Sequence, residues 1–145
     1  MAREPRFIDE YLLYLLARAS HTVSAEFHKV LRTQDVGVAE WRVLATLHGS
    51  GGESVGVLAD ACLMQQPTMT KTLDRMAREG LVERGVDAGD GRIVRVRLTE
   101  QGAVAAAGLV DAARAHEATV IARMRPGEAA TVKALLHGLL ARHGG

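Results

Sequence analysis

Two short helical patterns followed directly by a pair of strand patterns place the strongest limit on how this chain can fold. Ser54 stands at an N-cap position before apolar residues at helical spacing, and Pro67 stands near the start of the second helical pattern. Residues 81–84 and the alternating residues 93–98 flank a turn-rich stretch, which is typical of a β-hairpin. Helices and hairpin in this order predict a winged helix-turn-helix, a fold whose second helix fits the major groove of duplex DNA.

Further helical patterns lie on both sides of this unit. Apolar residues three and four positions apart predict one long helix from Phe7 to Leu31 and another from Val38 to Leu47. Thr99 is placed to cap a long alanine-rich helix that runs to about Met124, and Pro126 opens a last helix.

The length of 145 residues fits one ordinary domain, because domains hold roughly 100–200 residues. We therefore expect a mainly α-helical fold with a small β-wing, in one domain that spans residues 1–145. In this domain the winged helix-turn-helix lobe occupies about residues 36–99, between helical segments at about 6–34 and 100–143.

Composition excludes several classes of protein. Apolar residues at 48% and charged residues at 24% are far from the signature of a disordered chain. The apolar stretches are too short for a membrane span and the first residues do not form a signal peptide, so we expect a cytoplasmic protein. A net charge of +1 excludes a strongly basic nucleic-acid binder, so any DNA binding must be local.

The helical pattern near Pro67 separates an apolar face from a polar face. Met69, Leu73 and Met76 form a stripe that we expect to face the core. The opposite face carries Gln66, Thr70, Lys71, Asp74 and Arg78. An ordinary solvated face is the alternative interpretation, but the helix-turn-helix context and the wing favour contact with DNA.

Several of these side chains suit contacts with DNA. Gln66 can form two hydrogen bonds with adenine. Thr68 or Thr70 can contact a phosphate or the methyl group of a thymine, and Lys71 and Arg75 can bind phosphates. Residues 65–98 hold seven basic and five acidic side chains. This excess is small, so it favours DNA binding only if the acids face away from DNA or hold arginines in place.

Residues 41–102 resemble the MarR family of bacterial transcriptional regulators in the order and spacing of six motifs. The motifs are Trp41-Arg42-Val43-Leu44, Gln66-Pro67-Thr68-Met69-Thr70-Lys71, Leu73-Asp74-Arg75-Met76, Gly80-Leu81-Val82-Glu83-Arg84, Asp87-Ala88-Gly89-Asp90-Gly91-Arg92 and Leu98-Thr99-Glu100-Gln101-Gly102. The resemblance implies an obligate homodimer, whose first and last two helices form a dimerisation layer and whose two winged lobes bind a near-palindromic operator. It also implies that Asp90 holds Arg92 at the wing tip, where Arg92 enters a minor groove.

Three positions depart from the common family pattern. Gly91 stands where many relatives have Arg or Lys, which predicts one phosphate contact fewer. Gln65 stands where a small capping residue often starts the DNA-binding helix; it caps poorly but can itself hydrogen-bond to a base or phosphate. Cys62 lies in the helix after Ser54, whereas peroxide-sensing members carry their reactive cysteine in the first helix, so peroxide sensing is not implied. The candidate DNA-contacting residues are Ser54, Gln65, Gln66, Thr68, Thr70, Lys71, Arg75, Asp90 and Arg92.

All five aromatic residues precede residue 42. Each can simply pack in the core or in a dimer interface. Together with nearby basic side chains they can also line a cleft between the first two helices and the lobe, and clefts of this kind bind small aromatic acids in the family. An arginine beside aromatic rings suits a carboxylate on a flat ring. The candidate ligand-binding residues are Tyr11, Tyr14, His21, His28, Trp41 and Arg42.

Other chemistry finds no support in the sequence. His21 and His28 are seven positions apart, which does not match a metal-site spacing, so we expect no metal and no cofactor. Cys62 falls on an apolar stripe and is interpreted as a small buried residue rather than a nucleophile. The glycines at 49, 51 and 52 end a helix and do not form a phosphate-binding loop. We therefore expect no enzyme.

Three functions remain to be compared. The leading hypothesis is a homodimeric DNA-binding regulator of transcription, a repressor released from a palindromic operator by a small aromatic acid. The first alternative is a winged-helix module that binds a protein without recognising DNA sequence. The second alternative is a hydrolase that uses Cys62.

Overall fold

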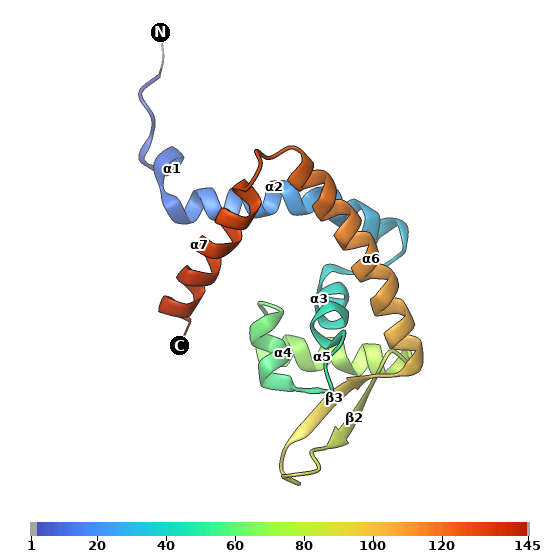
Figure 1. Ribbon diagram of the computed structural model, residues 1–145. Coiled ribbons are helices and arrows are strands. Elements are labelled where there is room, and N and C mark those ends of the chain that lie inside the picture. The colour runs from blue at the N-terminus through green and yellow to red at the C-terminus, as the bar shows by residue number, and fades with distance from the viewer. Residues whose placement is uncertain (1–2, 145) are drawn as a thin grey trace. The chain divides into compact units, whose positions relative to one another are not determined.

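The computed structural model describes residues 3–144, which form two compact units whose boundary lies within one helix. The first unit ends at Asp111 and the second begins at Ala112. The elements in chain order are α1 Phe7–Glu10, α2 Leu12–Thr33, α3 Val38–Leu47, β1 Glu53–Ser54, α4 Val55–Ala61, α5 Gln66–Arg78, β2 Val82–Val86, β3 Val94–Leu98, α6 Glu100–Ala122 and α7 Glu128–His143 (Figure 1). The predicted mainly helical fold with a small β-wing is confirmed.

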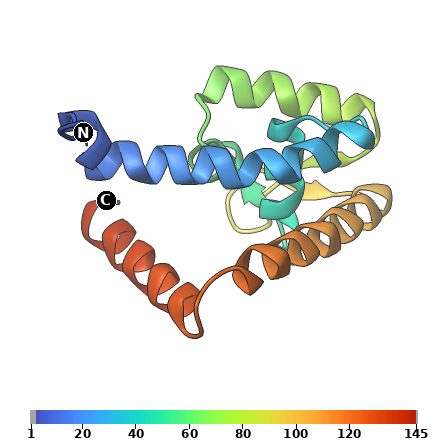
Figure 2. The same cartoon turned by 90° about the horizontal axis from the view of Figure 1, so that it is seen from above.

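The predicted single helix from Phe7 to Leu31 is wrong at its beginning, where a bend separates α1 from α2 (Figure 2). Tyr11 has an extended backbone, with φ −75° and ψ 117°, and belongs to neither helix. The Asp9 carboxylate accepts hydrogen bonds from the backbone N–H and the guanidinium of Arg6, and Phe7 stacks on Tyr11 with ring centroids 5.1 Å apart. These local contacts stabilise the bend, although the apolar periodicity continues through it.

The core of the first unit lies among α3, α4 and α5. Its fully buried side chains include Val43, Leu44, Leu47, Leu58, Cys62, Met69, Leu73 and Met76. α2 contributes Phe27 and Leu31, and Phe27 packs edge-on against Trp41 at a centroid distance of 5.0 Å. The predicted apolar stripe of the helix after Pro67 is therefore confirmed.

The wing is part of a three-stranded antiparallel sheet with the order β1-β3-β2. The predicted hairpin is confirmed, with Arg84 of β2 opposite Val96 of β3. On the other edge of β3, Glu53 of β1 also pairs with Val96. A strand of two residues shows no alternation of its own, so the sequence did not predict β1. Val96 is fully buried, and the hairpin extends away from α3, α4 and α5 (Figure 1).

α6 is fixed to the lobe where it follows β3. The Thr99 hydroxyl accepts a hydrogen bond from the Gly102 N–H at 3.0 Å and donates one to the Gly80 carbonyl at 2.6 Å. The predicted cap at Thr99 is therefore confirmed. Gly102, Ala106 and Leu109 form the buried face of α6 in the first unit.

The second unit comprises the end of α6 and α7. α7 begins two residues after Pro126, because Gly127 with φ 81° occupies the N-cap position. Lys133 and Glu117 form an ion pair at 3.1 Å within this unit. Among residues 3–144, no helix has the length and apolar character needed to cross a lipid bilayer.

Candidate DNA-binding surface

A tight turn joins α4 to α5. Leu63 in this turn has φ 59°, which is unusual for a residue with a side chain, and the Met64 N–H donates to the Ala59 carbonyl at 2.9 Å. At the other end of α4, the Ser54 hydroxyl accepts from the Val57 N–H at 3.2 Å, which confirms the predicted N-cap. Ser54 therefore has a structural task beside the DNA contact expected for it.

α5 presents a polar face to the outside of the lobe. Gln65, Gln66, Thr68, Thr70, Lys71 and Arg78 are all exposed. Gln65 occupies the N-cap position without a capping hydrogen bond, as its side chain suggested. The Gln66 amide lies against the first turn of α4, where Gly56 leaves room for it. This face has the size and polarity that a major groove accepts.

Arg84 connects the wing to α5. Its Nη1 lies 2.7 Å from Asp74 Oδ1, and its Nη2 donates to the Thr70 carbonyl at 3.4 Å. The acidic side chain on the polar face of α5 is thereby neutralised by the wing. α5 and β2 consequently present one continuous surface.

Asp87 organises the wing tip. Its Oδ1 accepts from Arg95 Nε at 2.7 Å, and its Oδ2 accepts from the backbone N–H groups of Gly89 and Asp90, each at 3.0 Å. The hydrogen bond from Arg95 lowers the pKa of the Asp87 carboxyl, and the two backbone donors lower it further.

The structure brings Asp90 and Arg92 together at this tip. Arg92 Nε donates to Asp90 Oδ1 at 3.2 Å, and its backbone N–H donates to the same oxygen at 3.0 Å. These bonds lower the pKa of the Asp90 carboxyl. Because the Arg92 side chain is still 91% exposed, its guanidinium remains open to an incoming phosphate or groove.

We expect the wing to lose its order only in acid. The pKa values of Asp87 and Asp90 are lowered in the folded protein, so their stabilising effect is present above the ordinary carboxyl pKa and disappears as pH falls through the lowered values. In an NMR titration, the amide resonances of Gly89 and Asp90 should hold their positions from neutral pH to about pH 4 and shift below it. Asp87→Asn should shift them already at neutral pH. A transition of the wild-type resonances near neutrality would contradict this assignment.

Arg75 points away from the polar face of α5, although it was predicted as a phosphate-binding residue. Its Nη1 lies 3.4 Å from Glu79 Oε1 and 4.0 Å from Glu40 Oε2. A phosphate contact by Arg75 therefore requires a change of rotamer, which Lys71 does not need because it is exposed.

The residues predicted to bind a ligand are spread along α2 and α3. Tyr11 directly precedes α2 and Tyr14 lies in its first turn, and at 1.5 Å of rise per residue Tyr14 and His28 are about 21 Å apart along the helix. His28 is half-buried, and burial lowers its pKa, with further lowering by the charges of Arg42, Arg32 and His21. Within one chain, the two tyrosines therefore lie far from His28 and its basic neighbours.

Trp41 and Arg42 both have partners within the first unit. Trp41 packs on Phe27, and Arg42 Nη1 donates to the Cys62 carbonyl at 3.4 Å. Cys62 is fully buried, and this burial raises the pKa of its thiol. A raised pKa disfavours the thiolate that a nucleophile needs.

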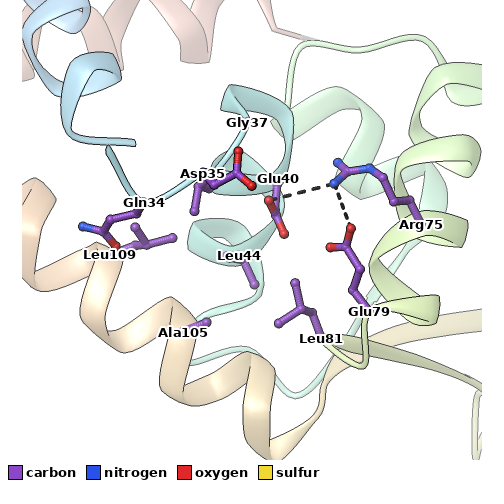
Figure 3. A pocket seen from close by; sticks show the side chains of 11 residues that line it. Gln34, Asp35, Gly37, Glu40, Leu44, Arg75, Glu79, Leu81, Ala105 and Leu109 are labelled. Atoms are coloured by element: carbon purple, nitrogen blue, oxygen red, sulfur yellow. Dashed lines mark hydrogen bonds and ion pairs between the residues drawn. The ribbon is translucent and has the colours of Figure 1, made fainter. Parts of the chain in front are cut away.

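A cavity of about 730 Å³ opens on another side of α3 (Figure 3). None of the six predicted ligand-binding residues lines it. Its wall is apolar at Leu44, Leu81 and Leu109 and charged at Glu40, Arg75 and Glu79.

Sequence reasoning missed several residues of these sites. Asp87 could have been found from the Asp-x-Gly spacing, which is typical of a carboxylate that bonds to the backbone two residues on. No local signal indicates the partners of Arg84 or Glu40, because both residues pair with side chains of α5, which is a different element from their own.

Comparisons with known proteins agree with this arrangement. Residues 34–93 match the model of the MarR family. The chain is similar to the transcriptional repressor IacR of Pseudomonas putida, with 32% identity over 94 residues, 65% of this chain and 56% of that protein. The chain thus spans little more than half of this curated relative.

Solved structures cover more of the chain. The chain is similar to the MarR family transcriptional regulator SPO1453 of Silicibacter pomeroyi, with 43% sequence identity and a TM-score of 0.86. The match covers 94% of this chain and 98% of that protein. The S. aureus MepR–DNA complex is 25% identical, with coverage of 91% and 98% and a TM-score of 0.74. The identity and coverage of the match with SPO1453 show that this chain belongs to the MarR family.

Proposed function

We propose that this protein is a homodimeric repressor that binds a palindromic operator and is released from it by a small aromatic acid. The observation that carries the proposal is the continuous surface of α5 and the wing, which Arg84 joins through Asp74. Gln65, Gln66, Thr68, Thr70 and Lys71 lie exposed on this surface, with Asp90 and Arg92 at its tip. The solved DNA complex of MepR and the repressor IacR, both similar to this chain, support the same function.

Exposed apolar side chains support the homodimer. Ile8, Leu12 and Leu15 at the start of the first unit are 37%, 60% and 43% exposed. In the second unit, Leu135 and Leu140 are 65% and 66% exposed. Apolar surface of this extent is typical of an interface with another chain. A two-fold axis then places the two α5 helices on one face of DNA, with half-sites about 34–36 Å apart. A cytoplasmic location accompanies this proposal.

Salt-dependent binding of Lys71→Ala tests the DNA interface. Removing one phosphate contact should weaken binding to all sequences alike and reduce the slope of log affinity against log salt by about one. Fluorescence anisotropy with the intergenic DNA beside the protein's own gene measures both effects, and a footprint on that DNA should show two half-sites.

Lys133→Ala is the matched control, because this lysine lies in the second unit and pairs with Glu117. Its salt slope should equal that of the wild type. The absence of salt-dependent duplex binding would instead favour the protein-binding module.

The effector is tested with Arg42→Ala and Trp41→Ala. An aromatic carboxylate that releases DNA must bind the released state more tightly, and a tenfold loss of operator affinity needs about 1.4 kcal/mol of coupling. Both variants should bind DNA normally but respond less to the acid, whereas the exposed Lys29→Ala should respond fully. Calorimetry over a panel of such acids measures the binding itself. Normal responses of both variants would reject this pocket while leaving the DNA-binding surface intact.

A further inference from the structure

The cavity beside α3 is built from several parts of the first unit. Asp35 belongs to the α2–α3 connection, Glu40 to α3, Glu79 caps the end of α5, and Leu109 belongs to α6. Figure 3 shows Glu40, Arg75 and Glu79 meeting on one side, with Leu44 and Leu81 beneath them. The volume of about 730 Å³ lies within the range of small-molecule sites, roughly 300–1,000 Å³.

The charges of this cavity are not balanced. Asp35, Glu40 and Glu79 supply three carboxylates, and Arg75 is the one basic residue among those that line it. Arg75 lies closer to Glu79, at 3.4 Å, than to Glu40, at 4.0 Å. The side chain of Glu40 is only 8% exposed, and besides the contact with Arg75 its carboxylate accepts a hydrogen bond from the Gly37 N–H at the start of α3.

The ionised form of Glu40 is consequently disfavoured. Burial raises the pKa of its carboxyl and the neighbouring Glu79 raises it further, whereas Arg75 and the Gly37 N–H lower it only in part. A second cation between the two carboxylates would stabilise the ionised form.

We propose that this cavity binds a small organic cation, a protonated amine on an apolar body. Its ammonium group donates hydrogen bonds to Glu40 and Glu79, and its apolar part packs on Leu44, Leu81 and Leu109. A bare metal ion fits less well, because residues 3–144 contain no group of three or more His, Cys, Asp or Glu that could hold one. The site also differs in charge from the aromatic-acid site proposed above, since the excess of carboxylates repels an acid.

Calorimetry on the full-length protein without DNA tests this site. The probes are 2-phenylethylamine, the neutral 2-phenylethanol and the anionic phenylacetate, which share one aromatic body. We expect the amine to bind about tenfold more tightly than the alcohol, because it makes one charge-assisted hydrogen bond that the alcohol cannot make. We expect that the acid does not compete with the amine for the cavity. NMR with the amine should shift the amides of Leu81, Ala105 and Leu109.

Variants locate the ammonium group. Glu79→Gln lies at an exposed position, so the protein should fold, and it should bind the amine about tenfold more weakly. Glu40→Gln should act in the same direction. Glu83→Gln is the control, because Glu83 is exposed on β2 outside the cavity and should leave binding unchanged.

Three results would overturn the proposal: no binding of the amine, equal binding of amine and alcohol, or equal losses in Glu79→Gln and Glu83→Gln. Because no DNA takes part, each outcome is independent of the proposed repressor function.

Discussion

Gly102→Ala is expected to destabilise the first unit by about 3 kcal/mol, because α6 lies directly on the backbone of residue 81. A Cβ at Gly102 would lie 2.9 Å from the Leu81 carbonyl carbon and still closer to its oxygen. Backbone atoms cannot turn aside as a side chain can, and the same oxygen accepts the Thr99 N–H at 3.1 Å. α6 would have to move outward and expose Ala106 and Leu109. Urea unfolding followed by circular dichroism measures the loss.

Gly108→Ala in the same helix is the matched control. Nothing lies within 4 Å of a Cβ at this position. Alanine should therefore stabilise the helix by about 0.5–1 kcal/mol through its better helix propensity. If both variants lowered the urea midpoint of unfolding by the same amount, contact with residue 81 would not be the cause of the destabilisation.

Gln66→Ala is expected to cost about 1–3 kcal/mol of preference for one base pair of the operator. Gln66 lies exposed on the first turn of α5, the end of a recognition helix that contacts base edges. Its amide can donate to and accept from adenine together, whereas alanine can do neither. Competition assays with operators changed at one base pair at a time should show a relaxed preference at a single position.

Gln101→Ala provides the control for this substitution, because Gln101 is also an exposed glutamine but lies on α6. It should preserve every base preference. If Gln66→Ala weakened binding to random DNA as much as binding to the operator, Gln66 would be a phosphate contact instead.

Local signals explain why much of the lobe could be predicted from the sequence. The bounds of α3 at Val38 and Leu47 were anticipated because Gly49 follows the last apolar residue, and it has φ 75°. The caps at Ser54 and Thr99 are equally local, since each bonds to an N–H three residues on. The bend at Tyr11 could not be predicted, because it depends on a ring stack and an ion pair that compete with helical periodicity.

The site was predictable only where helical periodicity determines exposure. Periodicity placed Gln66 and Lys71 on the outer face of α5. Arg75 lies between the two faces, and it contacts Glu79 at the end of α5 as well as Glu40, which belongs to another helix. The same limit applies to the cavity, whose charged and apolar residues come from segments far apart in the sequence.

The order of the strands has a consequence for the behaviour of the protein in concentrated solution. β3 carries the most apolar alternation of the wing, yet it is the central strand and has β1 and β2 on its two edges. An open strand edge invites pairing with other molecules and aggregation, and charged side chains discourage it. The outer strand β2 carries Glu83 and Arg84. The charges of β2 therefore discourage a neighbouring molecule from pairing with the outer edge of the wing.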